Sequence, residues 1–330
     1  MTRRIHRWRE PWTDRQAQRR LGAVACLVLL AIVLMIVFVF AKAWPSLSAN
    51  GPAWLGWGGS VDKQLSGMLV TSQHPPASAY HLRAWPLIYG TLLTTVFAVS
   101  VGLVFSTFAA VFIVEFAPPR LRAAVIPAVR LLAAVPSVIY GLIGILLIVP
   151  FVGNHLISID RKRSVEHVVQ LDGTGVLVAC VVLTIMVTPI MIAIIVDALR
   201  AIPTGWTEGA AALGANRWEA IWGVSVRAAR PAMIAAAVLA GARALGEAVM
   251  ISMVSGSRGF SPNFLDGITY IFEPIRTLAA AMIENVDGIN APAVRSSVYL
   301  FAALLLFASL VLSVAGYIAK LPLRRQGMRV

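Results

Sequence analysis

Arg243 and Glu247 are charged residues within a stretch of the chain that otherwise carries no charge. Residues 241–253 read GARALGEAVMISM, and the neighbours of the two charges are small or apolar. On a continuous helix, residues four apart lie on one face, so the two side chains can form an ion pair. A guanidinium group also binds oxyanions through a planar fork of N–H donors. The pair is therefore a candidate for binding an anion, for gating a path, or only for fixing helix packing.

The composition indicates that this charged pair lies in a membrane protein. Of the 330 residues, 58% are hydrophobic and 13% are charged, and the mean hydropathy is +0.80. A soluble domain is about one quarter charged. The net charge of +13 does not by itself identify a partner, because membrane proteins concentrate Lys and Arg in cytoplasmic loops.

Six stretches have about the 20 apolar residues that a helix needs to cross the hydrocarbon core. They are residues 21–41, 86–114, 131–152, 176–196, 231–254 and 298–318. The predicted fold is therefore all-α, with six transmembrane helices. The first stretch follows an Arg-rich tail, as in a signal peptide. Its apolar run is about twice as long as that of a usual signal peptide, so we expect it to stay as a span.

The basic residues predict the orientation of these spans. With both termini in the cytoplasm, 18 Lys and Arg residues fall on the cytoplasmic side, nine fall outside, and Arg243 lies within a span. This asymmetry follows the positive-inside rule. It accounts for the basic surplus, so we expect no nucleic-acid partner. The DRKR run at 160–163 is an exception, because it falls in an outer loop, where it either attracts anions or is solvated.

The position of Arg243 in its span predicts that it faces the protein interior. If the span begins near Pro231, Arg243 lies about 18 Å along the helix, near the middle of a core that is ~30 Å thick. An arginine facing lipid there costs at least ~2.5 kcal/mol. The surrounding residues, such as Gly241 and Gly246, are small enough for close helix packing. Arg243 should therefore face other helices or a water-filled cavity.

Two hydroxyl groups are further candidates for contact with an anion. Ser137 and Tyr140 belong to the PSVIYG run at 136–141, within the third predicted span. Both side chains can donate a hydrogen bond. With Arg243 and Glu247 they form the predicted path or gate.

The loop between the fourth and fifth spans has the pattern of a docking element. It contains TEGAAALGANRWEAIW at 207–222. Thr207 is a typical helix cap, followed by an acidic residue in the first turn. Gly214 then predicts a turn. Trp218, Ile221 and Trp222 follow at helical spacing. A short helix, a turn and a helix with exposed aromatic residues would fit a groove of a partner protein.

Motifs for catalysis and for cofactor binding are missing from the sequence. There is no Gly-rich ATP-binding loop of the G-x-x-x-x-G-K-[ST] type and no C-x-x-C pair. Cys26 and Cys180 lie far apart in apolar runs, and no His lies in a predicted span. We therefore expect no metal, no cofactor and no catalytic activity in this chain. If ATP powers its work, another chain must bind and hydrolyse the nucleotide.

The docking loop resembles a known motif. Its sequence EGAAALGANRWEAIWGVSVR is similar to the EAA loop of ABC importer permeases, E-A-A-x(3)-G-x(9)-I-x-L-P, which forms their coupling helix. Glu208 and Gly214 match, whereas Gly209 and Arg227 replace the usual alanine and proline. The resemblance implies that the ATPase contacts the following residues: Glu208, Gly209, Ala210, Ala211, Ala212, Leu213, Gly214 and Trp218.

Longer stretches resemble the PstC-type permeases of phosphate-specific ABC importers. The likeness runs from about residue 86 to 320, and PSVIYG at 136–141 and RALGE at 243–247 are its most specific parts. It implies a type I importer permease subunit with phosphate as the transported substrate. The implied partners are a PstA-like second permease, two copies of a PstB-like ATP-binding subunit and an external PstS-like phosphate-binding protein.

Several alternatives stay open at the level of sequence. The chain could be the sister PstA-type permease, or a permease for another oxyanion such as molybdate or sulfate. A membrane anchor that recruits an ATPase without forming a pore is an alternative of another class, and so is a secondary transporter. The charges at mid-span favour a pore, and the coupling-like loop argues against a secondary transporter.

The predicted organisation has five parts. They are a cytoplasmic N-tail (1–20), a first span (21–41), an external segment (42–85), a permease core (86–320) with the coupling loop at 198–230, and a cytoplasmic C-tail (321–330). An external amphipathic helix is expected near Ile275 to Met282, from helical spacing of apolar residues. The resemblance places the chain in the bacterial cytoplasmic membrane.

Overall fold

The computed structural model describes residues 11–56, 60–69, 80–165, 170–259, 261–262 and 264–325. The arginines at positions 3, 4, 7 and 9 of the N-tail lie outside this range, as do the last five residues of the C-tail. Within it, regular structure is helical apart from one isolated bridge between Gly256 and Ile275. Six helices are long and apolar enough to cross a membrane, so the all-α fold is confirmed.

The first half of the chain contains α1 (Pro11–Asn50), η1 (Gly51–Leu55), α2 (Val61–Gly67), α3 (Trp85–Val111) with η3 (Phe112–Phe116), α4 (Pro119–Ala133), α5 (Ser137–Ile143) with η4 (Gly144–Ile148), α6 (Val149–Phe151), η5 (Val152–Leu156) and α7 (Ile159–Val165). The second half contains α8 (Val176–Arg200), α9 (Thr204–Ala212), α10 (Arg217–Ala220) with η6 (Ile221–Ser225), α11 (Val226–Leu245), α12 (Val249–Val254), η7 (Phe264–Phe272), α13 (Leu278–Glu284), η8 (Asp287–Asn290) and α14 (Pro292–Arg325).

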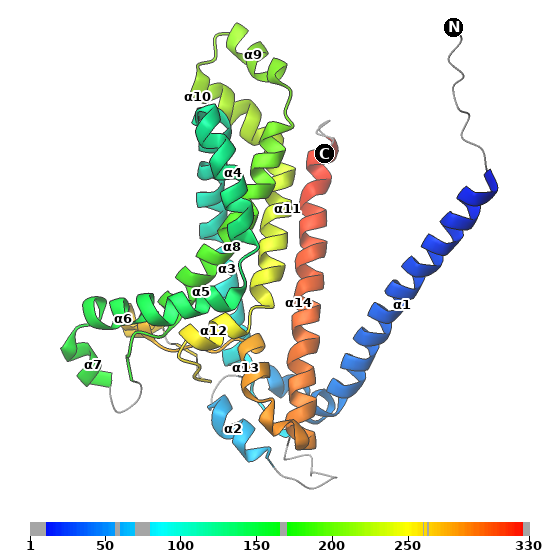
Figure 1. Cartoon of the computed structure of the whole chain (residues 1–330). Coiled ribbons are helices and arrows are strands. Elements are labelled where there is room, and N and C mark those ends of the chain that lie inside the picture. The colour runs from blue at the N-terminus through cyan, green and yellow to red at the C-terminus, as the bar shows by residue number, and fades with distance from the viewer. Residues whose placement is uncertain are drawn as a thin grey trace.

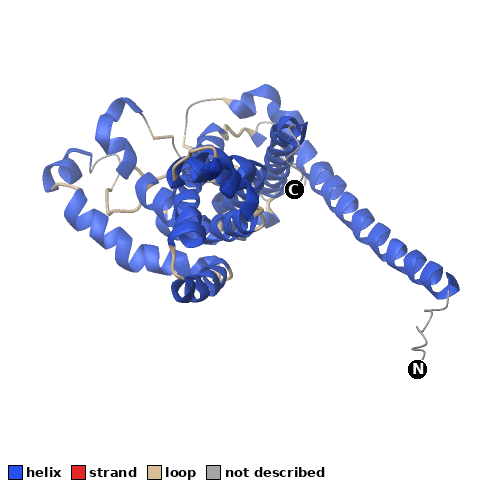
Figure 2. Ribbon diagram, turned by 90° about the horizontal axis from the view of Figure 1, so that it is seen from above, coloured by secondary structure: helices blue, strands red, loops and turns tan. Residues whose placement is uncertain are grey.

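The long helices form a bundle with two distinct ends (Figure 1). At one end, here named the α9 end, lie α9, α10, the amino end of α1 and the carboxyl end of α14. At the other, the α13 end, lie α2 and α13. Figure 2 shows α1 leaving the bundle on one side and the α5–α7 segment extending from another. The amino end of α1, the carboxyl end of α14 and the α9 loop therefore share one side, as the orientation predicted from sequence requires.

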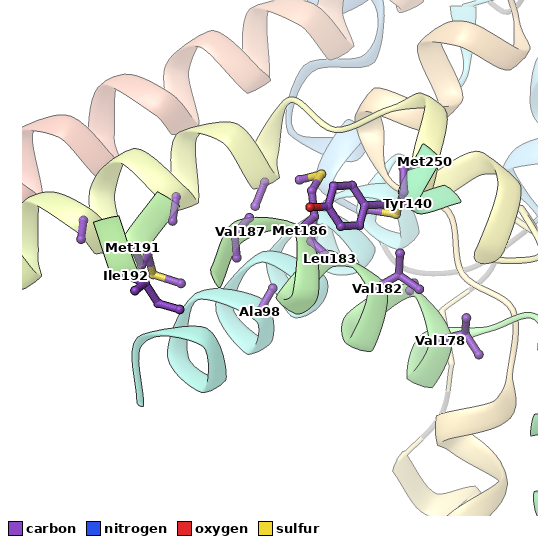
Figure 3. Packing of buried hydrophobic residues seen from close by; sticks show 14 of the residues in the cluster. Ala98, Tyr140, Val178, Val182, Leu183, Met186, Val187, Met191, Ile192 and Met250 are labelled. Atoms are coloured by element: carbon purple, nitrogen blue, oxygen red, sulfur yellow. The ribbon is translucent and has the colours of Figure 1, made fainter. Parts of the chain in front are cut away.

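Helix α8 is the centre of the bundle. Its apolar stretch is 61% buried, the largest share among the six spans, whereas that of α1 is 0% buried. A helix that is hydrophobic all round is stable when surrounded by other apolar groups. Figure 3 shows Val182, Leu183 and Met186 of α8 near Tyr140 and Met250, which belong to two other helices. The core is therefore built around α8.

The third span differs from its prediction because the chain breaks inside it. We expected one span from residue 131 to 152, but α4 ends at Ala133 and α5 begins at Ser137. The ring of Pro136 disfavours a helical conformation at Val135 and supplies no N–H group. Residues 131–133 therefore belong to α4, and the apolar span is Ser137–Leu156.

The fifth span is also interrupted. It was expected to run from Pro231 to Val254, but the continuous helix starts at Arg217 and ends at Leu245. Gly246 ends α11, and the next helix begins at Val249. Glycine favours helix termination because its backbone freedom is costly to restrict.

Ionic contacts join the segments at the α13 end. Arg276, whose side chain is 11% exposed, pairs with Asp62 and, at 2.8 Å, with Glu284. Ser257 donates to the Glu284 carboxylate and accepts from Arg276. Burial raises the pKa of Glu284, while the Ser257 hydrogen bond and the Arg276 charge oppose that shift. The network connects α2, the 255–259 segment and α13.

The helix expected near residues 275–282 is confirmed but is shorter. It begins at Leu278, where the Thr277 hydroxyl accepts the Ala280 N–H at 3.2 Å. Ile275 lies outside this helix in the bridge to Gly256. Leu278 and Ala279 are buried, so the apolar face packs on the bundle.

Gly90 allows α3 to approach the 275–276 segment. A Cβ atom at Gly90 would lie 2.3 Å from the Arg276 carbonyl oxygen. We expect Gly90→Ala to lower the free energy of unfolding in detergent by about 1–3 kcal/mol. Gly22→Ala is the matched control, because nothing lies within 4 Å of its Cβ position in α1. Equal stability of the two variants would contradict this close contact.

Candidate functional site

The break between α4 and α5 leaves backbone carbonyls that need donors. The Leu132 carbonyl accepts the Val135 N–H at 3.2 Å and the Tyr140 hydroxyl at 2.9 Å. The Ala133 carbonyl accepts Nη1 of Arg243 at 3.1 Å. The last carbonyls of a helix have no partner within the helix, and the end carries a partial negative charge. A positively charged side chain is therefore well matched to this end of α4.

This junction lies inside the bundle. Gly241, half a turn before Arg243, packs against Leu312 of α14, and Val99 of α3 is also close. Both neighbours lie well within their apolar spans. Arg243 itself is partly buried. Arg243 thus lies on the side of the bundle that the α4 end covers, in the last turn of its helix and not in the middle.

Glu247 occupies the second break. It lies between α11 and α12, is 8% exposed, and its Oε1 accepts the Met250 N–H at 3.2 Å. The first N–H groups of a helix lack partners within it, and a carboxylate at this end interacts favourably with the helix dipole. Glu247 therefore stabilises the start of α12.

The expected ion pair between Arg243 and Glu247 is absent from the structure. Both residues are described, yet each binds the backbone of another segment. The prediction assumed one continuous helix, whereas the break at 246–248 removes the four-residue spacing along a single face. Met250 likewise lies on α12 and does not continue the face of α11. Each charge matches the dipole of the helix end that it contacts.

Ser137 and Tyr140 differ in their surroundings. The Tyr140 side chain is 9% exposed and its hydroxyl binds the α4 end, which is also bound by Arg243. Ser137 starts α5 and is partly buried. The structure thus brings Tyr140 and Arg243 to one helix end, with Ser137 one turn away from Tyr140. A role of these side chains in a path stays a prediction.

Helices α5 and α12, which follow the two breaks, pack against each other. A Cβ at Gly141 would lie 3.1 Å from the Met250 Cα and 2.9 Å from the Met253 sulfur. On the other side of the break the surface is open and apolar, with Leu131 72% exposed. The described chain alone does not cover this face. The junction therefore has one side fixed by the bundle and one side free to contact a partner or a solute.

The predicted docking loop contains the expected turn. Helix α9 ends at Ala212, and Gly214 has a φ of +90°. The Gly214 N–H binds the Ala211 carbonyl and the Ala215 N–H binds the Ala210 carbonyl. This pair of bonds is a Schellman motif, which glycine favours because it adopts positive φ without strain.

The start of the loop helix was predicted four residues too late. Helix α9 begins at Thr204, after Pro203, and the Thr207 hydroxyl donates to the Thr204 carbonyl at 2.8 Å. Thr207 is therefore inside the helix and does not cap it. With this start, Trp206 and Leu213 lie seven residues apart on one face, and they are 50% and 92% exposed. Sequence reasoning missed Trp206 because it placed this residue before the helix.

The aromatic residues after the turn face the bundle. Asn216 and Glu219 form a capping box that starts α10. The Trp218 ring lies 6.0 Å from Phe116 and the Trp222 ring 5.6 Å from Phe108. Trp218 is still 53% exposed. The expected exposed aromatic stripe is thus reduced to Trp218, because Ile221 is buried and Trp222 packs on Phe108 of α3. Trp206 and Leu213, in and directly after α9, are further exposed apolar residues of the loop.

Arginines also bind the end of α3. Arg122 Nε donates to the Ile113 carbonyl at 3.0 Å. Arg217 donates to the Glu115 carbonyl, and its guanidinium lies 4.5 Å from the centre of the Phe116 ring. These contacts tie α4 and α10 to the same helix end. The α9 loop is therefore connected to the bundle through side chains that were not in the predicted site.

We expect Arg243→Gln to destabilise the protein. The change removes a charge-assisted hydrogen bond to Ala133, so the free energy of unfolding in detergent should fall by about 1.5–3 kcal/mol. Arg230→Gln is the matched control, since Arg230 is an exposed residue of the same helix. A loss of equal size in both variants would contradict a specific role for Arg243 at the α4 end.

Comparison with known proteins identifies the family. Residues 102–322 match the family described as binding-protein-dependent transport system inner membrane component. The chain is 31% identical over 299 residues to a probable phosphate transport system permease protein PstC of Methanocaldococcus jannaschii, covering 88% of both chains. It is 32% identical over 282 residues to PstC of Xylella fastidiosa, covering 82% of this chain and 84% of that one. The chain thus belongs to the family of inner membrane components of binding-protein-dependent transport systems.

Proposed function

We propose that the chain is a permease subunit of an ATP-driven importer of inorganic phosphate. Relatives named as phosphate permeases align over more than four fifths of it. The observation that carries the mechanism is the contact between Arg243 and the end of α4, inside the span region. The Ala133 carbonyl is a neutral acceptor that an oxyanion can replace on the guanidinium. Such an exchangeable bond suits a site that must bind an oxyanion briefly and then release it.

The proposed step is an exchange of acceptors on Arg243. Its guanidinium has five N–H donors, and the structure shows one of them bound to the Ala133 carbonyl. A phosphate oxyanion that reaches the junction competes for this fork. When the guanidinium leaves the Ala133 carbonyl, the carboxyl end of α4 loses this contact and can move. Anion binding at Arg243 is thereby coupled to movement of α4. The carboxylate of Glu247, four residues away in sequence, disfavours an anion that lingers.

The link to the ATPase runs through one helix. We propose that the α9 loop, with Glu208 to Gly214 and Trp218, docks on the ATP-binding subunit in the cytoplasm. Residues 217–245 form a continuous helical segment from this loop to Arg243. At 1.5 Å per residue it spans about 40 Å. A displacement of the loop is therefore transmitted directly to the guanidinium.

The proposed assembly has a second, PstA-like permease, two copies of a PstB-like ATP-binding subunit and an external PstS-like phosphate-binding protein. ATP is bound by the partner, and this chain has no cofactor and is not an enzyme. Both termini lie in the cytoplasm. Molybdate and sulfate are the competing substrates, and the sister PstA-type permease is the competing subunit identity. A non-pore anchor is disfavoured, because an anchor has no need of Arg243 and Glu247 within the bundle.

The transport test uses the complete importer reconstituted in vesicles. ATP-dependent uptake of phosphate should fall at least about tenfold in Arg243→Gln, because the lost bonds are charge-assisted. Arg243→Lys should restore part of the rate, and Arg230→Gln should transport normally. Glu247→Gln should alter the release of phosphate more than its entry. Normal transport by assembled Arg243→Gln complexes would reject the exchange mechanism, and uptake of molybdate in place of phosphate would reject the substrate.

The docking test reverses one exposed charge. We expect Glu208→Arg to detach the ATP-binding subunit or to abolish its stimulation, measured by co-purification and by ATP hydrolysis of the complex. Asp287→Arg, an equal reversal at the α13 end where the residue is also exposed, should leave both unchanged. Intact binding and stimulation in Glu208→Arg would remove the docking assignment.

A further inference from the structure

The basic run that departs from the predicted charge pattern lines a cavity. Lys162 and Arg163 belong to α7, and with segment 170–172 they enclose a hollow of about 360 Å³. Ligand sites have about this size or more. Segment 170–172 leads into α8, which starts at Val176. The hollow therefore lies beside the α13 end of that span.

The two cations of this cavity have no partner among the residues that the structure describes. Neither Lys162 nor Arg163 forms an ion pair or a side-chain hydrogen bond with any described residue. The one carboxylate in the lining, Asp172, accepts the Thr174 N–H at 2.8 Å and the Thr174 hydroxyl at 2.6 Å. Among the described lining residues the remaining charge is therefore positive, which favours an anion.

Ile159 is the exposed apolar residue of the cavity lining, and further exposed apolar side chains precede it in the chain. Ile159, next to it on α7, is 67% exposed, and Phe151 and Leu156 are 55% and 46% exposed. All three precede or begin the basic run within the chain segment that extends from the bundle (Figure 1). Cations beside exposed apolar groups at the end of a span are typical of contact with phospholipid, whose headgroup is charged and whose chains are apolar.

The position of α7 argues against a role for the cavity in the transport path. Helix α7 lies at the edge of the molecule, away from α11 and α12 (Figure 1), and these helices flank Arg243 and Glu247. A free anion bound at α7 is not delivered to that junction. A molecule of the surrounding membrane reaches the edge directly.

We propose that the cavity between α7 and segment 170–172 binds the phosphate group of an anionic phospholipid. Lys162 and Arg163 contact the headgroup, and the acyl chains lie along Ile159, Leu156 and Phe151. The bound lipid neutralises the basic run and holds α7 at the membrane interface. The inference does not depend on the transported substrate.

The test measures lipid preference with the full-length chain in detergent. The unfolding temperature is followed while phosphatidylglycerol, or phosphatidylcholine with the same chains, is added, because a ligand of the folded state raises this temperature. Wild-type protein should bind phosphatidylglycerol about tenfold more tightly than phosphatidylcholine. Lys162→Gln/Arg163→Gln should lose this preference. Lys162→Arg/Arg163→Lys should keep it, which separates charge from folding.

The matched control removes two other charges at the same end. Lys63→Gln/Arg295→Gln changes exposed residues near the α13 end and should keep the lipid preference. An equal shift with inorganic phosphate would overturn the proposal in favour of a free-anion site. An unchanged preference in Lys162→Gln/Arg163→Gln would also overturn it.

Discussion

The structure depends on positively charged side chains bound to backbone carbonyls where helices end inside the membrane-spanning bundle. In an apolar medium an unpaired carbonyl costs several kcal/mol, and water is not there to satisfy it. Arg243 meets this need at the end of α4, and Arg122 binds carbonyls at the end of α3 in the same way, at the α9 end of the bundle. Because these acceptors are neutral backbone groups, each bond is weaker than a pair with a carboxylate would be. These bonds therefore stabilise the helix ends but can be exchanged for other acceptors.

The two breaks explain why charges lie in an apolar sequence. A chain that only crossed the membrane would need neither Arg243 nor Glu247. Once α4 stops at Ala133 and α12 starts at Val249, one end presents carbonyls and the other presents N–H groups. The arginine and the glutamate match these opposite partial charges. Their four-residue spacing in sequence reflects the geometry of a bend between helices, and not a salt bridge along one helix.

Most of the fold could be predicted from the sequence, because span number depends on the length and polarity of segments alone. The positions of the breaks were harder to predict. Pro136 signals the first break locally, but Gly246 is weak evidence, since glycine is common in membrane helices. The partners of Arg243 lie 110 residues away, so no local pattern reveals them. In the loop, Gly214 identified the turn, whereas the aromatic residues after it pack on α3, a tertiary contact that spacing cannot show.

The exposed state of α1 has a consequence for how the protein is made. None of its most apolar stretch is buried against the rest of the chain, although toward its carboxyl end Phe38 meets Tyr299 and Ser46 bonds to Ser297 of α14. Its insertion therefore depends mainly on its own hydrophobicity. Helices can insert first and associate later. A newly inserted copy of the chain therefore exposes the apolar surface of α1 to lipid until another membrane protein covers it.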